Sequence, residues 1–504
     1  MKYYSFFLLG ILFSFASQAQ TGNQFVIGKA DSVYSHILKE KRKIWVYLPN
    51  MKSASPDASQ RYPVVYLLDG EGHFESVVGM IQQLSQVNGN TIVPEMIVVG
   101  IPNTDRTRDL TPTHIASDPP MMDSISSKNT GGGENFTSFL EKELMPHIDS
   151  LYPTQKYKML IGHSFGGLAV MNILNNRPRL FNSYIAIDPS MWYDKEQFLK
   201  TTTQKLSTQK YDGVSLYLGI ANTLPEGMTL EKMKQDKSTD TRHIRSIFAL
   251  DKFIKDHQQN GLKYASKFYA NDDHGSVPFT TEYDGLRFIF NWYRFKFTQA
   301  DFSDSSTGIV DRLTKHYHTL SKEFGYTISP SEMQVNSLGY NALSQKQYPK
   351  AAALFEMNIR NYPKSGNVYD SYADMWLAQN DTAKAISNFQ KALDVQFNAD
   401  TRQKLDMLMG KASFVLTTKD MEKYVGAFQF EGMALTATSY IKDNFLWAVV
   451  PGQQPEQLVP TSLHVFGVKG KPGEQVRFEM DGGKLLGFTF TSPSVTYKAS
   501  LKKE

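Results

Sequence analysis

A serine in this chain sits where it could act as a nucleophile. Residues 162–166 read Gly-His-Ser-Phe-Gly, between an apolar run at 158–161 and a helical pattern at 167–176. A tight strand-to-helix turn exposes the serine hydroxyl, and glycines beside it allow the backbone to turn without a clash. We therefore predict that Ser164 attacks a carbonyl carbon in acyl transfer. The alternative is a serine that only caps a helix.

A histidine far along the chain is placed to act as the general base. His274 lies in the stretch Asn-Asp-Asp-His-Gly, between an expected strand and a helical pattern. Loops at the carboxyl ends of parallel strands meet at one edge of an α/β sheet, so His274 can approach Ser164 there. The alternative is a solvated turn histidine. Other histidines have no comparable position: His73, His114 and His243.

The acid that would orient this base has two candidates. Glu226 is the first carboxylate after the expected strand at 214–220, and Asp236 and Asp240 follow in the same loop. Asp188 ends the preceding strand, a second position from which an acid can reach the base. We favour Glu226 and keep Asp188 as the alternative, while a dyad without any acid is a third possibility.

Two backbone N–H groups could stabilise the negative charge that develops on the carbonyl oxygen. One is that of Phe165, directly after the nucleophile. The second is expected from Gly70 or Glu71, in the turn after an apolar run at 64–68. The glycines at 131–133 are a competing donor loop, which we interpret as a hinge.

A long irregular stretch at 103–135 could cover such a site, since long loops in compact domains often do. It contains Arg106 and Arg108. These arginines could bind an acidic or oxygen-rich substrate, although structural salt bridges are the commoner use.

The elements that must position these residues follow an α/β pattern. Short apolar runs alternate with amphipathic stretches, which predicts a mostly parallel sheet with helices on both faces. Earlier runs such as 43–48 would add antiparallel edge strands. We expect this hydrolase-type domain over residues 20–298. The expected strands are 64–68, 96–101, 158–161, 184–187, 214–220 and 266–269.

The remainder of the chain predicts two further segments. In 299–412 a helical pattern repeats with a displacement of 34 residues, from Gly339 and Phe355 to Ala373 and Phe389, which resembles a tetratricopeptide repeat. Residues 413–504 show short alternating runs with glycine turns, which predicts a small β-sandwich or barrel. The helical segment could bind a protein partner.

Composition limits the remaining possibilities. Residues 1–19 resemble a signal peptide, which predicts a periplasmic or secreted protein. The chain has no cysteine, which excludes disulfides and thiolate chemistry, and its 54 basic and 50 acidic side chains make nucleic acid an unexpected partner. No segment is long and apolar enough to span a membrane.

Several motifs together resemble the enterochelin esterase and esterase D-like family of α/β-hydrolases, which includes feruloyl esterases and mycolyl transferases. They span roughly residues 33–297. The resemblance implies Ser164 as nucleophile, His274 as base, an acid after the strand at 214–220, and contact of Arg106 and Trp192 with substrate. We expect no metal or organic cofactor. Relatives commonly carry a glutamate where this chain has Asn222. The matching segments are 66–70, 99–103, 162–167, 188–192 and 273–275.

We therefore expect an exported serine esterase that hydrolyses a siderophore-like, feruloyl or acetyl ester, a small-molecule or glycan substrate, through an acyl-enzyme. An acyltransferase with the same intermediate is an alternative. A third possibility is a non-catalytic scaffold that binds partners through its helices.

Overall fold

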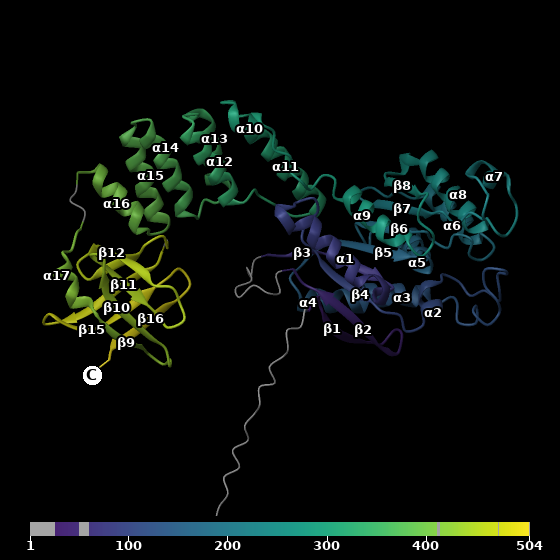
Figure 1. Cartoon of the computed structure of the whole chain (residues 1–504), viewed down its shortest axis with the longest axis horizontal. Coiled ribbons are helices and arrows are strands. Elements are labelled where there is room, and N and C mark those ends of the chain that lie inside the picture. The colour runs from purple at the N-terminus through teal and green to yellow at the C-terminus, as the bar shows by residue number, and fades with distance from the viewer. Residues whose placement is uncertain (1–25, 50–59, 411–413, 472, 503–504) are drawn as a thin grey trace, which may run out of the picture. The chain divides into compact units, whose positions relative to one another are not determined.

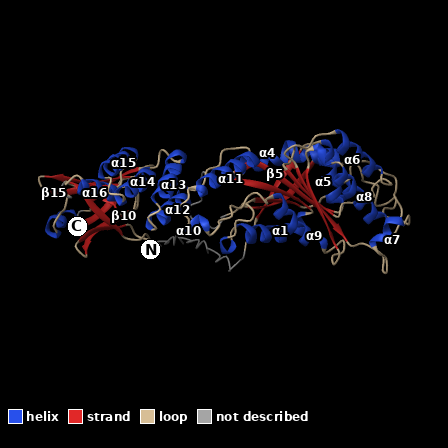
Figure 2. Cartoon of the chain, turned by 90° about the horizontal axis from the view of Figure 1, so that it is seen from above, coloured by secondary structure: helices blue, strands red, loops and turns tan. Residues whose placement is uncertain are grey.

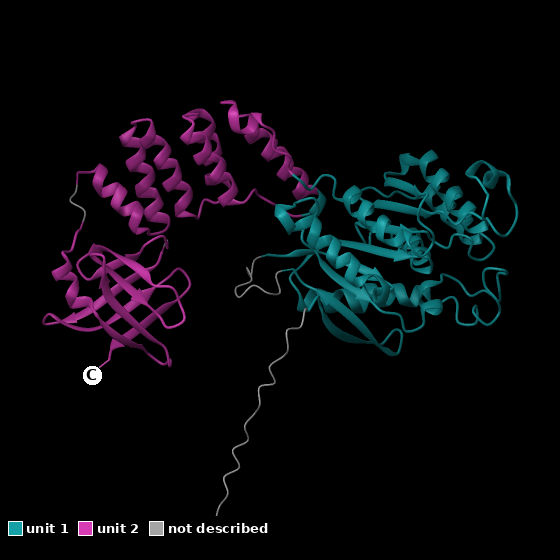
Figure 3. Cartoon of the chain, in the orientation of Figure 1, with its two compact units in different colours: residues 1–294, 323–325 teal, residues 295–322, 326–504 magenta. Residues whose placement is uncertain are grey.

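The computed structural model describes residues 26–49, 60–410, 414–471 and 473–502 (Figure 1). The expected signal peptide lies outside these residues. Contacts divide the chain into two units, residues 1–294 with 323–325 and residues 295–322 with 326–504 (Figure 3). The predicted end of the hydrolase-type domain, residue 298, is four residues beyond the main break of the first unit at 294.

The first unit contains an eight-stranded mixed sheet with the order β1-β2-β4-β3-β5-β6-β7-β8. Pairing from β4 to β8 is parallel, whereas β1 and β2 pair antiparallel at one edge, as predicted. The strands are β1 (Lys29–Ser35), β2 (Glu40–Tyr47), β3 (Tyr62–Leu68), β4 (Ile97–Ile101), β5 (Thr154–His163), β6 (Ser183–Ile187), β7 (Ser215–Ala221) and β8 (Lys263–Tyr269).

Helices cover both faces of this sheet, so its central strands are apolar on both sides (Figure 2). One face carries α1 and α9, and the other carries α5, α6 and α8. Every residue of β3, β4, β6 and β7 is buried. The helices are α1 (Gly70–Ser85), α2 (Arg106–Leu110), α3 (Gly133–Phe139), α4 (Met145–Leu151), α5 (Phe165–Asn176), α6 (Gln197–Thr208), α7 (Leu230–Gln235), α8 (Arg242–Asp256) and α9 (Val277–Ile289), with shorter turns η1 (Val87–Gly89), η2 (Leu140–Leu144) and η3 (Gln258–Asn260).

The second unit begins with helices whose positions repeat along the chain. The starts of α12 and α14, Glu332 and Gly366, lie 34 residues apart, and so do those of α13 and α15. Membership of the tetratricopeptide class stays a prediction. The helices are α10 (Ala300–Ser303), α11 (Gly308–Phe324), α12 (Glu332–Ser344), α13 (Tyr348–Asn361), α14 (Gly366–Ala378), α15 (Thr382–Val395) and α16 (Ala399–Leu408).

The last segment is a closed antiparallel barrel. Of the two architectures that the sequence predicted, a β-sandwich or a barrel, the structure has the barrel. Aromatic rings fill its interior, among them Tyr424, Phe478 and Phe488, which contact one another or Phe428. The elements are α17 (Thr418–Met421), η4 (Glu422–Tyr424), β9 (Gly426–Phe430), β10 (Thr436–Lys442), β11 (Phe445–Val449), β12 (Glu456–Ser462), β13 (Val465–Val468), β14 (Gln475–Asp481), β15 (Lys484–Thr491) and β16 (Thr496–Leu501).

Within the residues that the structure describes, no helix has both the length and the apolar character needed to cross a bilayer.

Candidate active site

Ser164 lies on a strained turn between β5 and α5. Its backbone has φ 59° and ψ −114°, outside the regions that residues other than glycine usually adopt. Two hydrogen bonds hold this turn against the next strand, since the Ser164 N–H donates to the Ile187 carbonyl at 3.0 Å and the Ser190 N–H donates to the Ser164 carbonyl at 3.2 Å. The local geometry is that of the predicted nucleophile elbow.

The glycines around Ser164 are required by close backbone contacts. A Cβ on Gly162 would overlap the carbonyl oxygen of Gly166. A Cβ on Gly167 would lie 2.9 Å from Cα of Pro189, on the loop after β6. The glycine pattern therefore permits the sharp turn at Ser164 and brings the elbow close to the end of β6.

His274 is held by Asp188, so the structure joins the predicted base to one of its two candidate acids. His274 lies between β8 and α9, and its Nδ1 is 2.6 Å from Oδ2 of Asp188. Asp188 directly follows β6 and is completely buried, with Oδ1 accepting the N–H of Ala221 at 2.9 Å. This carboxylate fixes the His274 ring and leaves its Nε2 available to accept a proton.

The surroundings of Asp188 keep it ionised. Burial alone would raise the pKa of its carboxyl group, but hydrogen bonds from His243 and His274 oppose this effect and bring the pKa well below its usual range. At neutral pH the group is a buried carboxylate that accepts several hydrogen bonds. It can therefore stabilise an imidazolium form of His274 during a reaction.

The described residues contain no hydrogen bond between Ser164 Oγ and His274. The adjacent His163 places its ring 4.5 Å from the His274 ring, centroid to centroid, so the base lies next to the elbow. Hydrogen bonds to a catalytic base are often long in a free enzyme and shorten when substrate binds.

Glu226, the sequence-based first choice for the acid, is not brought to His274. Its side chain is exposed in the loop after β7. The nearby Asn222 has a different role, because its N–H donates to the Asp272 carbonyl at 2.8 Å and its Nδ2 donates to the Ala270 carbonyl at 2.9 Å. Asn222 therefore braces the loop that carries His274.

The predicted oxyanion donors lie at the starts of two helices. Phe165 is the first residue of α5, so its N–H has no partner within the helix. Gly70 is the first residue of α1, where a Cβ would lie 2.6 Å from the Ile101 nitrogen, and Glu71 follows it. The competing glycine loop instead leads into α3, where a Cβ on Gly132 would lie 2.8 Å from the Arg108 carbonyl oxygen.

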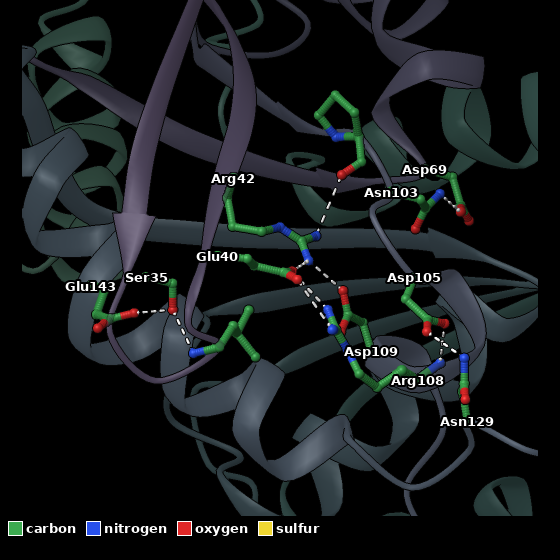
Figure 4. A network of polar contacts seen from close by, with 12 residues as sticks. Ser35, Glu40, Arg42, Asp69, Asn103, Asp105, Arg108, Asp109, Asn129 and Glu143 are labelled. Atoms are coloured by element: carbon green, nitrogen blue, oxygen red, sulfur yellow. Dashed lines mark hydrogen bonds and ion pairs between the residues drawn. The ribbon is translucent and has the colours of Figure 1, made fainter.

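Arg106 connects the turn after β3 to the elbow. Its Nε donates to Asp69 Oδ1 at 2.6 Å, its Nη2 donates to the His163 carbonyl at 3.2 Å, and its guanidinium lies 5.5 Å from the Phe165 ring. Asn103 also donates to Asp69, at 2.7 Å (Figure 4). With 35% of its side chain exposed, Arg106 combines a structural ion pair with a surface that solutes can reach.

Arg108 belongs to a separate structural network. It donates to Glu40 and Asp109, and the buried Arg42 joins the same two carboxylates (Figure 4). These contacts tie β2 to α2.

Trp192 is mostly buried, with 5% of the residue exposed. Its ring lies 5.9 Å from that of Phe165 and 6.0 Å from the Arg242 guanidinium, which also donates to the Trp192 carbonyl. Trp192 therefore forms part of the wall behind the elbow and exposes little of its own surface.

Sequence reasoning missed His243. It lies in the first turn of α8, and its Nε2 is 2.8 Å from the same Asp188 oxygen that His274 contacts. The sequence signal was weak, because the 20 residues between the end of β7 and the start of α8 contain only the short helix α7 and do not indicate where His243 lies. Two imidazoles thus meet at one buried carboxylate oxygen.

The fold and these residues define an α/β-hydrolase-like esterase fold with a mixed sheet. The chain belongs to the Esterase family, described as “Putative esterase”, whose model matches residues 35–257. It is therefore a hydrolase of esters by family.

Three similar proteins support this placement. The ferri-bacillibactin esterase BesA of Bacillus subtilis is 31% identical over 210 residues, which cover 40% of this chain and 72% of that protein. The siderophore enterobactin esterase of Emericella nidulans is 25% identical over 289 residues, which cover 53% of this chain and 92% of that protein. The crystal structure of an IroE-like serine hydrolase from Shewanella oneidensis has 30% identity and a TM-score of 0.55, and the match covers 66% of this chain and 99% of that one.

Proposed function

We propose that this protein is a serine esterase that hydrolyses a siderophore ester through an acyl-enzyme, with Ser164 as nucleophile, His274 as base and Asp188 as acid. The observation that carries the proposal is the 2.6 Å contact between His274 Nδ1 and Asp188 Oδ2, beside a serine at φ 59°. The proposal thus assigns to Asp188 the role for which the sequence favoured Glu226.

The reaction begins when Ser164 Oγ attacks the ester carbonyl carbon and His274 Nε2 takes the hydroxyl proton. The tetrahedral intermediate then collapses, the bond to the alcohol breaks, and His274 returns its proton to the departing oxygen. In the second half, water attacks the acyl carbon while His274 removes a proton from it, and the bond to Ser164 Oγ then breaks as His274 returns the proton to that oxygen. Asp188 keeps the imidazolium oriented and balances its charge throughout.

The oxyanion is expected to bind the N–H of Phe165 together with an N–H of Gly70 or Glu71. Both groups begin helices, so the positive end of the helix dipole adds to the hydrogen bonds. The Asp69–Arg106 pair supports this arrangement, because Asp69 precedes Gly70 and Arg106 also holds the carbonyl of His163.

The substrate class comes from the relatives and from the side chains near the elbow. Two similar proteins are named for their action on siderophores. Around the elbow of this chain, Phe165 offers an aromatic surface with the cation of Arg106 over it. Such a surface suits an electron-rich aromatic acyl group that carries oxygen. We propose export to the periplasm or beyond, on the sequence pattern of residues 1–19.

The test is hydrolysis of three esters by the purified full chain. We expect kcat/KM for a triscatecholate siderophore lactone to exceed the values for a feruloyl sugar and p-nitrophenyl acetate by at least ~10-fold, because the aromatic surface binds the larger transition state. Ser164→Ala should abolish activity on all three substrates. Wild-type activity no greater than that of Ser164→Ala would refute the enzyme proposal, and a preference for the acetyl ester would refute the substrate assignment.

A further inference from the structure

The proposed reaction moves a proton through only one of the two imidazoles on Asp188, while the other, His243, takes part only through its hydrogen bond to that carboxylate. His243 Nε2 lies 2.8 Å from Asp188 Oδ2 and His274 Nδ1 lies 2.6 Å from it. These three donor atoms all lie within 4.8 Å of one another. Asp188 and most of the His243 side chain are buried, whereas 41% of the His274 side chain is exposed.

We propose that Asp188, His243 and His274 form a binding site for one divalent transition-metal ion of the zinc type. Two imidazoles and one carboxylate are a ligand set that binds such ions, and a fourth position on the exposed side of His274 can take water. No thiolate or oxygen-rich cage is present among the described side chains of this cluster, so Zn²⁺ or Cu²⁺ fits better than Ca²⁺ or Mg²⁺.

The geometry needs only a small adjustment to accept the ion. Tetrahedral ligands at about 2.0–2.1 Å from zinc are separated from each other by about 3.3 Å. The two nitrogens must therefore each move away from Asp188 Oδ2 by less than ~1 Å, starting from 2.8 and 2.6 Å. The exposed His274 loop can supply part of this movement.

Metal binding moves the proton of each imidazole from one ring nitrogen to the other, and the number of bound protons stays the same. In the metal-free form the proton that faces Asp188 is on His243 Nε2 and on His274 Nδ1. When those nitrogens coordinate the ion, the protons move to His243 Nδ1 and His274 Nε2. His243 Nδ1 is buried without a hydrogen-bond partner among the described residues, so the proton that it carries in the metal-bound form has no acceptor.

The consequence for activity rests on the proposed function. A His274 that carries its proton on Nε2 cannot take the proton of Ser164, so the bound ion stops the reaction until it leaves. Metal-ligating histidines usually have a partner for the second nitrogen, and its lack at His243 costs affinity. We therefore expect binding about 10–100-fold weaker than at a site in which both ligating imidazoles have such a partner, and inhibition that a chelator reverses.

Calorimetric titration of the untagged, chelator-treated full chain with zinc chloride tests the site itself. We expect one ion per chain for wild type and for Ser164→Ala, since Ser164 is not a ligand. His243→Phe should weaken binding at least ~10-fold. His257→Phe is the matched control, because His257 follows the other end of α8 and stacks on Phe253. It should bind zinc as wild type does.

Esterase assays on the same samples separate this proposal from the proposed function. Zinc should inhibit wild type and His257→Phe at the concentrations that saturate binding, and a chelator should restore the rate. Whatever activity His243→Phe retains should resist zinc at those concentrations. Saturable zinc binding without any esterase activity would refute the proposed esterase function and support the proposed metal site. The metal site would be refuted if zinc did not bind saturably to wild type. It would also be refuted if His243→Phe, with a circular dichroism spectrum like that of wild type, bound zinc equally well. His243→Asn replaces that variant if it fails to fold.

Discussion

At the residue scale, the proposed reaction depends on Asp188. It accepts hydrogen bonds at both carboxylate oxygens and is completely buried, so its charge is fixed at one place beside His274. Glu226 is exposed and has no comparable contact with the base. The two carboxylates can therefore be separated by mutation.

Asp188→Asn should lower kcat by at least ~100-fold, because an amide can no longer hold the His274 proton at Nδ1 or balance the imidazolium charge. Glu226→Gln, which removes an exposed charge, serves as the control and should stay within about twofold of wild type. Steady-state kinetics on one ester measures both. A larger loss in Glu226→Gln than in Asp188→Asn would return the acid role to Glu226.

His163 should make stability depend on pH. Burial, together with the nearby His274 and His73, lowers the pKa of His163 from 6.5 to about 4. In the unfolded chain this histidine binds a proton below about pH 6.5, whereas in the folded chain it binds one only below about pH 4. The free energy of unfolding therefore falls by roughly 3 kcal/mol as the pH drops through this window. His163→Gln should flatten that fall in urea titrations.

The control for this experiment is His257→Gln, which changes a histidine away from the elbow. A flattening that appears in His163→Gln and not in this variant is specific to the elbow. Equal slopes for wild type and His163→Gln would show that His163 takes up its proton at the same pH in the folded and unfolded chain.

At the element scale the elbow depends on glycines. Gly162→Ala would place a methyl group against the Gly166 carbonyl, so we expect lower stability by about 1–3 kcal/mol and a large loss of activity. Gly79→Ala is the matched control, since Gly79 is exposed within α1 with nothing within 4 Å of its Cβ. It should be stabilised by roughly 0.5–1 kcal/mol. Thermal unfolding and ester hydrolysis measure both variants, and equal effects would contradict the close contact at Gly162.

The elements themselves were largely predictable, and the acid was not. Doubly covered strands such as β3 and β7 are continuous apolar runs, and the glycines of the elbow mark their own positions, so sheet, elbow and base loop could be inferred locally. The choice between Asp188 and Glu226 depends on side-chain direction across two loops. The position of His243 depends on the packing of α8 against β7. Neither of these two features produces a periodic pattern in the sequence.

At the scale of the whole molecule, helix α11 contributes to both units. Its end belongs to the first unit, where the Phe324 ring lies 5.6 Å from that of Tyr157 and 5.2 Å from that of Trp292. Leu313, on the same helix, is buried in the core of the second unit. Each residue therefore reports on a different unit.

Phe324→Ala should destabilise the first unit by about 3–5 kcal/mol, because a buried ring leaves a cavity. In calorimetry the transition that coincides with loss of esterase activity should shift to lower temperature. Leu313→Ala, the control on the same helix, should shift the other transition instead. A single transition displaced equally by both variants would contradict the division into two units.

The proposed nucleophile is tested most directly by mass spectrometry of the peptide that contains residue 164, after treatment of the protein with a fluorophosphonate. We predict one adduct per chain, located on Ser164, which forms rapidly in wild type and at least ~100-fold more slowly in His274→Ala and Asp188→Asn. An adduct on a different residue, or labelling of Ser164 at the same rate in all three proteins, would contradict it.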